Sequence, residues 1–290
     1  MKTFASDNYS GIHPEIMEAL IQANFAHQIS YGDDEITAET NAIFRQHFGD
    51  VEVLYAFNGT GANIVSLKCA ILPFQSVICT DTAHIHVDEC GGPTQNIGST
   101  LVPLNTPDGK LTPGIIEHQL SFIGNVHHVQ PKVISVSQST ELGTIYTREE
   151  LKALADFAHK YDMYLHVDGA RISNAVAALG CTLKESTADC GVDIMSFGGT
   201  KNGMMMGEAI KNFVKTHPTT TNKRRNFFQK IVLLLLSSKL FLPTNCGIEW
   251  PLMPMKWLGC LPRKFQKLTA LPSLKKCRQM RCLSLSRNTL

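Results

Sequence analysis

Short apolar runs alternate with amphipathic segments from about residue 50 to residue 200. Five of these runs are rich in β-branched residues and almost continuously apolar, which is typical of strands buried on both faces. We therefore predict strands at 51–58, 76–81, 132–138, 163–168 and 192–197.

Apolar residues recur at helical spacing before and between these strands. Segment 147–161 is predicted to be a helix, because Thr147 and Glu150 form a capping box ahead of an apolar face. Helices are also predicted at 14–25, after a turn-rich arm, and at 64–72. This alternation predicts an α/β fold with a mostly parallel sheet sandwiched by helices. Ligands of such sheets bind outside the carboxyl ends of the strands.

The composition is that of an ordinary globular protein, with 43% hydrophobic and 18% charged residues among 290. The first 30 residues lack the unbroken apolar core of a signal peptide, and the longest apolar run, 231–236, is too short to cross a bilayer. Nine cysteines without C-x-x-C spacing indicate a reduced protein. We therefore expect a cytoplasmic location without a membrane segment.

The net charge of +2 conceals a break after Ile210. The first 210 residues contain 11 basic and 24 acidic residues, whereas the rest contain 16 basic residues and one acid, Glu249. A basic segment usually indicates nucleic acid or an acidic surface as partner. Because this one has few interleaved aromatic residues and no recognised binding motif, we do not expect a nucleic-acid partner.

A glycine-rich loop follows the first predicted strand. The segment FNGTGAN, 57–63, precedes an apolar helix, so its backbone N–H groups and the helix N-terminus are suited to bind a phosphate, with Thr60 adding a hydroxyl group. Turns of this composition are also common without a ligand.

Three charged residues follow the later strands. Asp168, in the motif HVDGAR, ends a buried strand, where a carboxylate can pair with a cationic ring nitrogen. Arg171 can hold a substrate carboxylate, although the two could equally form a structural salt bridge. Lys201 follows a Gly-Gly-Thr turn, and small neighbours would give a Schiff-base lysine room to move. An ordinary surface lysine is the alternative.

The segment HIHVDE, 84–89, alternates His84, His86 and Asp88 along one face of a strand-like run. A metal site is conceivable there, but an exposed polar face explains the pattern better, and we predict no metal.

In combination, these motifs resemble the threonine aldolases. The resemblance rests on Gly-Thr-Gly-Ala-Asn, on His with Glu five residues later and Gly-Gly after it, on His-Val-Asp-Gly-Ala-Arg and on Gly-Gly-Thr-Lys-Asn-Gly, with Tyr-Gly-x-Asp at 31–34. It runs from about Ser6 to Ile210. It implies a lyase of the β-eliminating group with the aspartate-aminotransferase fold, pyridoxal phosphate as cofactor, an amino acid as substrate, and a homodimer or homotetramer.

The resemblance also implies roles for individual residues. Lys201 would form the Schiff base, Asp168 would pair with the pyridinium nitrogen, and His84 would stack on the ring and assist the proton of the substrate's β-hydroxyl group. The phosphate loop would comprise Gly59, Thr60 and Asn63, with Gly59 and Thr60 favoured as contacts. Ser6 and Arg171 would hold the substrate carboxylate. The loop 138–144, QSTELGT, lacks the histidine of the family's Glu-Asn-Thr-His, so it assigns no second base.

The resemblance ends where the charge changes. We predict a large cofactor-binding domain with an N-terminal arm over 1–210 and a basic tail over 211–290 in place of the family's small C-terminal domain. Back-translation of 250–258 and 276–283, shifted by one nucleotide, allows family-like sequence in one shared frame. Our hypothesis is that the tail is translated out of frame; a divergent basic tail is the alternative.

The expected reaction is aldol cleavage of β-hydroxy-α-amino acids, with threonine or allo-threonine giving glycine and acetaldehyde. Two alternatives remain open. One is a related β-eliminating or phenylserine-type lyase, and the other is a catalytically dead product of a frameshifted gene.

Overall fold

The computed structural model describes residues 5–212. The predicted tail lies outside the described residues from residue 213 onward. No helix of the described part is long and apolar enough to cross a membrane.

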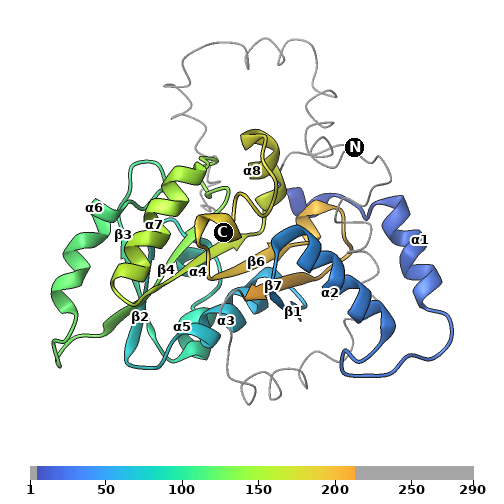
Figure 1. Ribbon diagram of the computed structural model, residues 1–290, viewed down its shortest axis with the longest axis horizontal. Helices are drawn as coiled ribbons and strands as arrows, with labels where there is room; N and C mark the ends of the chain where they lie inside the picture. Colours follow the sequence, from blue (N-terminus) through green and yellow to red (C-terminus); the bar gives the residue numbers. More distant parts are fainter. Residues whose placement is uncertain (1–4, 213–290) are drawn as a thin grey trace, which may run out of the picture. The chain divides into compact units, whose positions relative to one another are not determined.

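A seven-stranded sheet forms the centre of the fold, in the order β1-β7-β6-β5-β4-β2-β3 (Figure 1). Strands β3, β2, β4, β5 and β6 pair in parallel, and β7 pairs antiparallel with both β1 and β6. The sheet is therefore mostly parallel, which confirms the predicted α/β fold. The strands are β1 (Glu52–Ala56), β2 (Gln75–Thr80), β3 (Thr100–Leu104), β4 (Gln130–Ser137), β5 (Tyr164–Gly169), β6 (Ile194–Gly198) and β7 (Glu208–Asn212).

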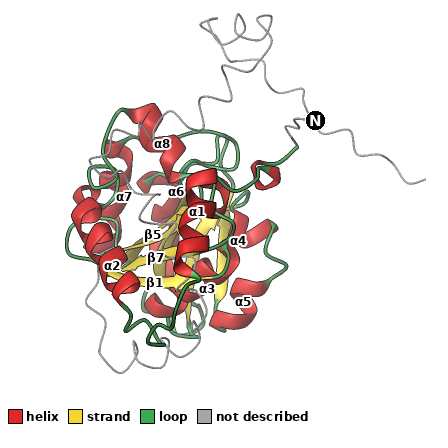
Figure 2. Cartoon of the chain, turned by 90° about the vertical axis from the view of Figure 1, so that its right-hand side faces the viewer, coloured by secondary structure: helices red, strands yellow, loops and turns green. Residues whose placement is uncertain are grey.

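Helices cover both faces of the sheet, as the edge view in Figure 2 shows. The α-helices are α1 (Pro14–Ala23), α2 (Glu35–Phe48), α3 (Gly59–Ala70), α4 (His84–Val87), α5 (Gly92–Ile97), α6 (Pro113–Ile116), α7 (Arg148–Lys160) and α8 (Ile172–Leu179). Short 3-10 helices are η1 (Asp7–Tyr9), η2 (Glu117–Phe122), η3 (Ala188–Cys190) and η4 (Thr200–Asn202). The capping box predicted for 147–161 is present in α7, where Thr147 and Glu150 exchange hydrogen bonds.

Alternate residues of the central strands point to two separate apolar cores. On one face, Val167 of β5 and Ala209 of β7 pack with residues of α2 and α7. On the other face, Ala56 of β1 and Ile210 of β7 pack with Ala62 of α3. Because side chains alternate along a strand, a residue two positions from any of these points to the same face as that residue.

Strand β7 continues past the predicted boundary at 210, and its fourth residue is unusual. The Lys211 side chain is fully buried on the α2 face. Its Nζ lies 2.9 Å from the ring centre of Phe48 and 3.6 Å from that of Phe197, and it has no hydrogen-bond partner within the described part. An ammonium group is attracted to aromatic faces, but that attraction is smaller than the cost of losing all hydration. Burial therefore lowers the pKa of Lys211 well below its ordinary value.

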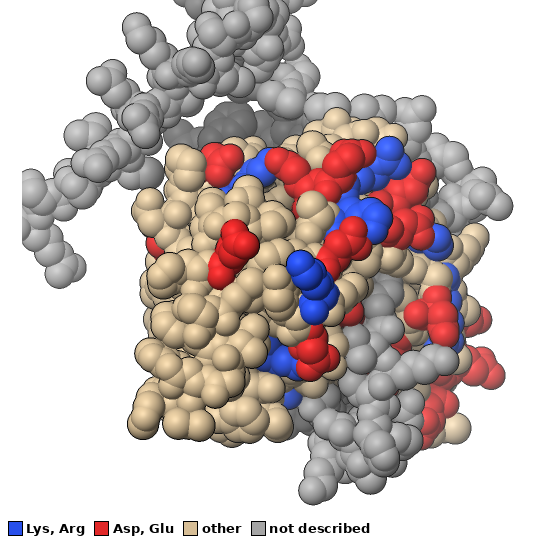
Figure 3. Space-filling view, turned by 60° about the vertical axis from the view of Figure 1, so that its left-hand side comes forward, with Lys and Arg blue, Asp and Glu red and all other residues tan. Residues whose placement is uncertain are grey.

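The surface of the described part carries acidic groups interleaved with fewer basic ones (Figure 3). Many of these charges form exposed ion pairs, such as Lys152–Asp156 and Lys184–Asp189. Exposed pairs of this kind contribute little to stability. The surface offers no broad basic area in this view, in keeping with the acidic balance of the first 210 residues.

Candidate active site

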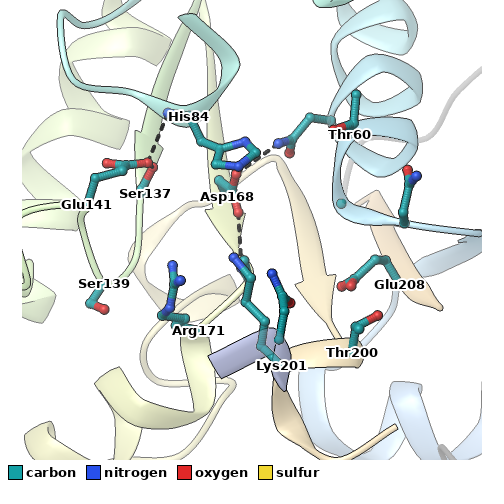
Figure 4. Close-up of a pocket in the computed structure, with 15 residues that line it drawn as sticks. Thr60, His84, Ser137, Ser139, Glu141, Asp168, Arg171, Thr200, Lys201 and Glu208 are labelled. Atoms are coloured by element: carbon teal, nitrogen blue, oxygen red, sulfur yellow. Dashed lines mark hydrogen bonds between the residues drawn. The ribbon is translucent and has the colours of Figure 1, made fainter. Parts of the chain in front are cut away.

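A cavity of about 200 Å³ opens at the carboxyl ends of the parallel strands, where a ligand was expected (Figure 4). The structure brings together there seven of the eight residues predicted for the site, which come from four segments far apart in the sequence: Gly59, Thr60, Asn63, His84, Asp168, Arg171 and Lys201. Ser6 does not line the cavity.

Asp168 lies at the end of β5 with 8% of its surface exposed. Its Oδ1 accepts a hydrogen bond of 3.0 Å from the backbone N–H of Ala170, and its Oδ2 accepts one of 2.8 Å from Nδ2 of Asn63. These bonds hold an almost buried carboxylate at the cavity wall. A group held in this way can pair with a cation inside the cavity.

Asn63 also connects Asp168 to Glu89, the acid five residues after His84 in the motif of the sequence, to which no role was assigned. Its Nδ2 donates a second bond, of 2.9 Å, to Oε1 of Glu89, and the same Oε1 lies 2.8 Å from Nδ1 of His84. The hydrogen bond to Glu89 raises the pKa of His84 above its ordinary value, although burial of the ring opposes this. The Asn63 amide nitrogen thus donates to two carboxylates, and both of its N–H groups are used.

Gly59 and Thr60 are the first two residues of helix α3. Asn58 caps it, accepting a bond of 2.8 Å from the backbone N–H of Gly61. The first N–H groups of a helix have no partner within the helix, so those of Gly59 and Thr60 are available to an anion. A Cβ atom on Gly59 would meet nothing within 4 Å, so the loop presents open space to a ligand.

Lys201 lies in η4, immediately after β6, and reaches into the cavity toward Asp168 (Figure 4). Glycine is required at the two positions before Thr200 for a different reason from the one predicted. A Cβ on Gly198 would overlap the backbone of Ala170, and one on Gly199 would overlap the carbonyl oxygen of Gly207. The glycines therefore permit close packing of the three backbone segments that place the lysine.

Arg171 contacts the N-terminal arm. Its Nε donates to Oδ2 of Asp7 at 2.6 Å, and its Nη2 donates to Oδ1 at 3.2 Å. Burial works to raise the pKa of Asp7, but the bonds and charge of Arg171 outweigh it and hold that pKa below its ordinary value. Ser6 caps η1 by accepting from the backbone N–H of Asn8, a cavity residue. A guanidinium has five N–H donors, so Arg171 keeps three beyond those bound to Asp7.

The loop that lacks the family's histidine places a carboxylate in the cavity wall instead. Oε1 of Glu141 accepts a bond of 3.0 Å from the backbone N–H of His84 and one of 2.6 Å from Oγ of Ser137. Its position at the fourth residue of QSTELGT was visible in the sequence. No role was predicted for this acid, because the prediction for the loop rested on the imidazole that is absent from it.

The strand-like assignment of 84–89 is wrong. Residues His84–Val87 form the short helix α4, so the alternating residues do not share one face. His84 lines the cavity, whereas His86 and Asp88 are exposed. Helix α4 follows the end of β2, and the backbone N–H of His84 at its start donates a hydrogen bond to Glu141.

Comparison with known proteins gives a consistent result. The model of the beta-eliminating lyase family matches residues 3–230. The low specificity L-threonine aldolase of Pseudomonas aeruginosa is 48% identical over 212 residues, covering 72% of this chain and 61% of that protein. The corresponding enzyme of Escherichia coli is 29% identical over 195 residues, covering 64% of this chain and 55% of that protein.

The fold matches solved structures as well. A threonine aldolase structure from Leishmania major superposes with a TM-score of 0.83 at 28% identity, covering 93% of this chain and 81% of the other. The chain spans only about three fifths of the length of the Pseudomonas aeruginosa relative.

Proposed function

Because the chain belongs to the β-eliminating lyase family, whose members depend on pyridoxal phosphate, we propose that it catalyses aldol cleavage of β-hydroxy-α-amino acids. Threonine or allo-threonine would give glycine and acetaldehyde. The observation that carries this proposal is that Lys201, Asp168 and His84, from three different elements, line one cavity with the N-terminal end of α3.

The groups around the cavity fit the cofactor chemically. Lys201 supplies an amine, the buried carboxylate of Asp168 suits a protonated pyridine nitrogen, and the N–H groups of Gly59 and Thr60 suit a phosphate. Pyridoxal phosphate, when bound, supplies a ring that accepts the electron pair left on Cα when the Cα–Cβ bond breaks.

The remaining residues of the cavity would orient the substrate and move its proton. Arg171 would bind the substrate carboxylate with its remaining donors, which fixes the direction of the Cα–Cβ bond. Breaking this bond requires that the β-hydroxyl group lose its proton as the aldehyde forms. The raised pKa of His84 makes its imidazole a better acceptor for that proton.

The first test is the visible absorbance of the full chain mixed with pyridoxal phosphate. We expect a yellow band that Lys201→Ala abolishes and that Lys152→Ala, a change at an exposed lysine of α7, leaves intact. Folded, soluble protein without this band would contradict the proposed site.

The β-substituent separates the main proposal from its closest alternative. A threonine aldolase releases acetaldehyde, whereas a phenylserine-type lyase releases an aromatic aldehyde. Rates of aldehyde formation from threonine, allo-threonine and phenylserine, each with Lys201→Ala as blank, distinguish the two. A band without release of any aldehyde would favour the catalytically dead product.

The division of the chain at residue 210 also remains a proposal. Its support is chemical: the first residue after the boundary is Lys211, whose ammonium group is buried among phenylalanine rings without a hydrogen-bond acceptor in the described part. An apolar residue is expected at such a position. Sequencing the coding DNA across residue 210 tests the frameshift, and an intact frame with no one-nucleotide slip would refute it. The homodimer or homotetramer implied by the family is tested by light scattering on the same protein.

A further inference from the structure

Glu208 is a buried carboxyl group in the cavity to which the sequence assigned no role. It is the first residue of β7 and pairs in register with Ala56 of β1 and Gly198 of β6. Directly opposed residues of a sheet point to the same face. Glu208 therefore shares the face of Ala56, which packs against Ala62 in the first turn of α3. Its carboxyl group points into the cavity above Thr200 (Figure 4).

The carboxyl group accepts hydrogen bonds, but within the described part of the chain it forms no ion pair. It is 9% exposed, and its Oε2 accepts a bond of 2.9 Å from the backbone N–H of Gly199. Burial raises the pKa of Glu208 to about 7, the charge of Asp168 acts in the same direction, and the bonds from Gly199 and Thr200 oppose it.

No basic residue among residues 5–212 forms an ion pair with Glu208. Strand β6 has no titratable residue, Glu52 lies at the opposite end of β1, and Lys68 of α3 donates to the carbonyl oxygen of Asn96. Lys211 of β7 points to the opposite face. The titratable groups that share the cavity with Glu208 are His84, Glu141, Asp168, Arg171 and Lys201.

The same cavity is lined by Gly59 and Thr60, where we place the phosphate of the cofactor. A phosphate monoester has its second pKa near 6, so it is mostly a dianion at neutral pH. Two anionic groups in one site disfavour each other's charge, and the weaker acid takes a proton. A protonated carboxyl group has an O–H that a phosphate oxygen can accept.

We propose that Glu208 takes up a proton when the phosphate of the cofactor binds and stays neutral in the complex. This inference rests on the proposed function, since it requires that the cavity bind a pyridoxal-type phosphate. Its consequence is a proton-linked affinity. Below about pH 7 the carboxyl group is already protonated. Above about pH 7, Glu208 must take a proton from the solvent each time the phosphate binds, so the affinity for the phosphate falls by up to tenfold per pH unit.

Isothermal titration calorimetry on the full chain tests this, with pyridoxine 5′-phosphate as the probe. The probe lacks the aldehyde, so it does not react with Lys201. Titrations in buffers of different ionisation enthalpy give the number of protons taken up. Glu208→Gln is the matched variant, because its amide oxygen can still accept from Gly199. Protonation of the probe's ring nitrogen beside Asp168 occurs in both proteins and cancels in the comparison.

At about pH 8 we expect the chain to take up nearly one proton more than Glu208→Gln. Between about pH 7 and pH 9 its affinity should fall by up to a hundredfold relative to that of the variant. Equal proton uptake with parallel pH profiles would overturn the inference and leave the cofactor site intact. Absence of probe binding at every pH would overturn both.

A measurement on the unmodified chain covers the case in which the variant does not fold. Infrared difference spectra at about pH 8 should show the C=O stretch of a protonated carboxyl group appearing when the probe binds. Absence of that band from the spectrum of the complex would overturn the inference.

Discussion

At the residue scale, Glu89 has a direct effect on the pKa of His84. Its Oε1 bonds both Asn63 and His84, and it raises the pKa of the imidazole. We predict that Glu89→Gln returns the pKa of His84 toward about 6.5. A raised imidazole pKa stabilises the fold fully below the unfolded value and ceases to do so as pH rises through the folded value. The variant should therefore lose stability at about pH 5.5, by about 1 kcal/mol because solvent screens the partly exposed imidazole, and lose less at about pH 9.

Ring-proton NMR titration and urea unfolding at the two pH values measure these effects. Glu18→Gln is the control, because this exposed residue of α1 keeps an acceptor for the side chain of Gln22. A loss of stability that is equal at both pH values would show that Glu89 does not act through the charge of His84.

Lys211 provides a second prediction at this scale. Its pKa is lowered by burial, so the unfolded chain binds the proton more readily than the folded chain. Stability should then rise with pH until the pKa of an unfolded lysine, about 10.4, is reached. We expect Lys211→Met to add about 3 kcal/mol at neutral pH, because the buried lysine must either keep its charge without a partner or lose its proton on folding, and to abolish the alkaline part of that rise. Unfolding by urea between about pH 7 and pH 10 tests both effects, and an unchanged or less stable variant would refute them.

At the element scale, the backbones of β6, the β5–α8 turn and the turn before β7 pack too closely for side chains. We predict that Gly198→Ala forces β6 away from Ala170, costs several kcal/mol and weakens the absorbance band with pyridoxal phosphate. Gly114→Ala in α6 is the control, because its added Cβ meets nothing within 4 Å and should be neutral or slightly stabilising. The midpoints of thermal unfolding of the two variants are compared. Equal midpoints would show that the close approach of β6 to Ala170 is not required for stability.

The same elements show how far the sequence predicts the structure. The buried parallel strands are marked by their β-branched runs: 163–168 is observed as β5 and 192–197 as β6, within one or two residues. Strand β7 was not predicted, because only Ala209 and Ile210 of its five residues are apolar and polar residues flank them on both sides. The helix at 84–87 was missed because a pattern of period two was assigned to a strand, whereas local backbone bonds from His86, Val87 and Asp88 form a helical turn there.

Site residues were predictable from the sequence where they lie at or just after the end of a strand. They were not predictable where their role depends on contacts with other segments. Asp168 and Lys201 follow buried strands, and the geometry of a parallel sheet brings such positions together. Glu141 and Asp7 become relevant only through partners in other segments, His84 for the first and Arg171 for the second. Sequence spacing carries no information about such pairs.

At the scale of the whole molecule, the chain must form the cavity and must also cover its exposed apolar surface. The cavity needs the described sheet and helices, whereas the relatives extend well beyond the region that matches them; that of Pseudomonas aeruginosa is covered to 61%. Several large apolar side chains near the N-terminal helix are exposed, with Ile21 at 63%, Phe25 at 83% and Ile29 at 69%. Exposed apolar patches of this kind mark interfaces or lead to aggregation.

We therefore predict that the 290-residue chain aggregates readily and cleaves threonine slowly even where it binds pyridoxal phosphate. A chain in which residues after Ile210 are replaced by the translation shifted by one nucleotide should be monodisperse and release acetaldehyde at least tenfold faster. Light scattering and aldehyde release from equal amounts of cofactor-loaded protein compare the two, with Lys201→Ala in each as blank. Because both chains share the residues that line the cavity, a difference between them would assign the missing function to the segment after residue 210. Equal turnover and equal dispersity would instead show that the basic tail is a working part of this protein, and the frameshift hypothesis would fail.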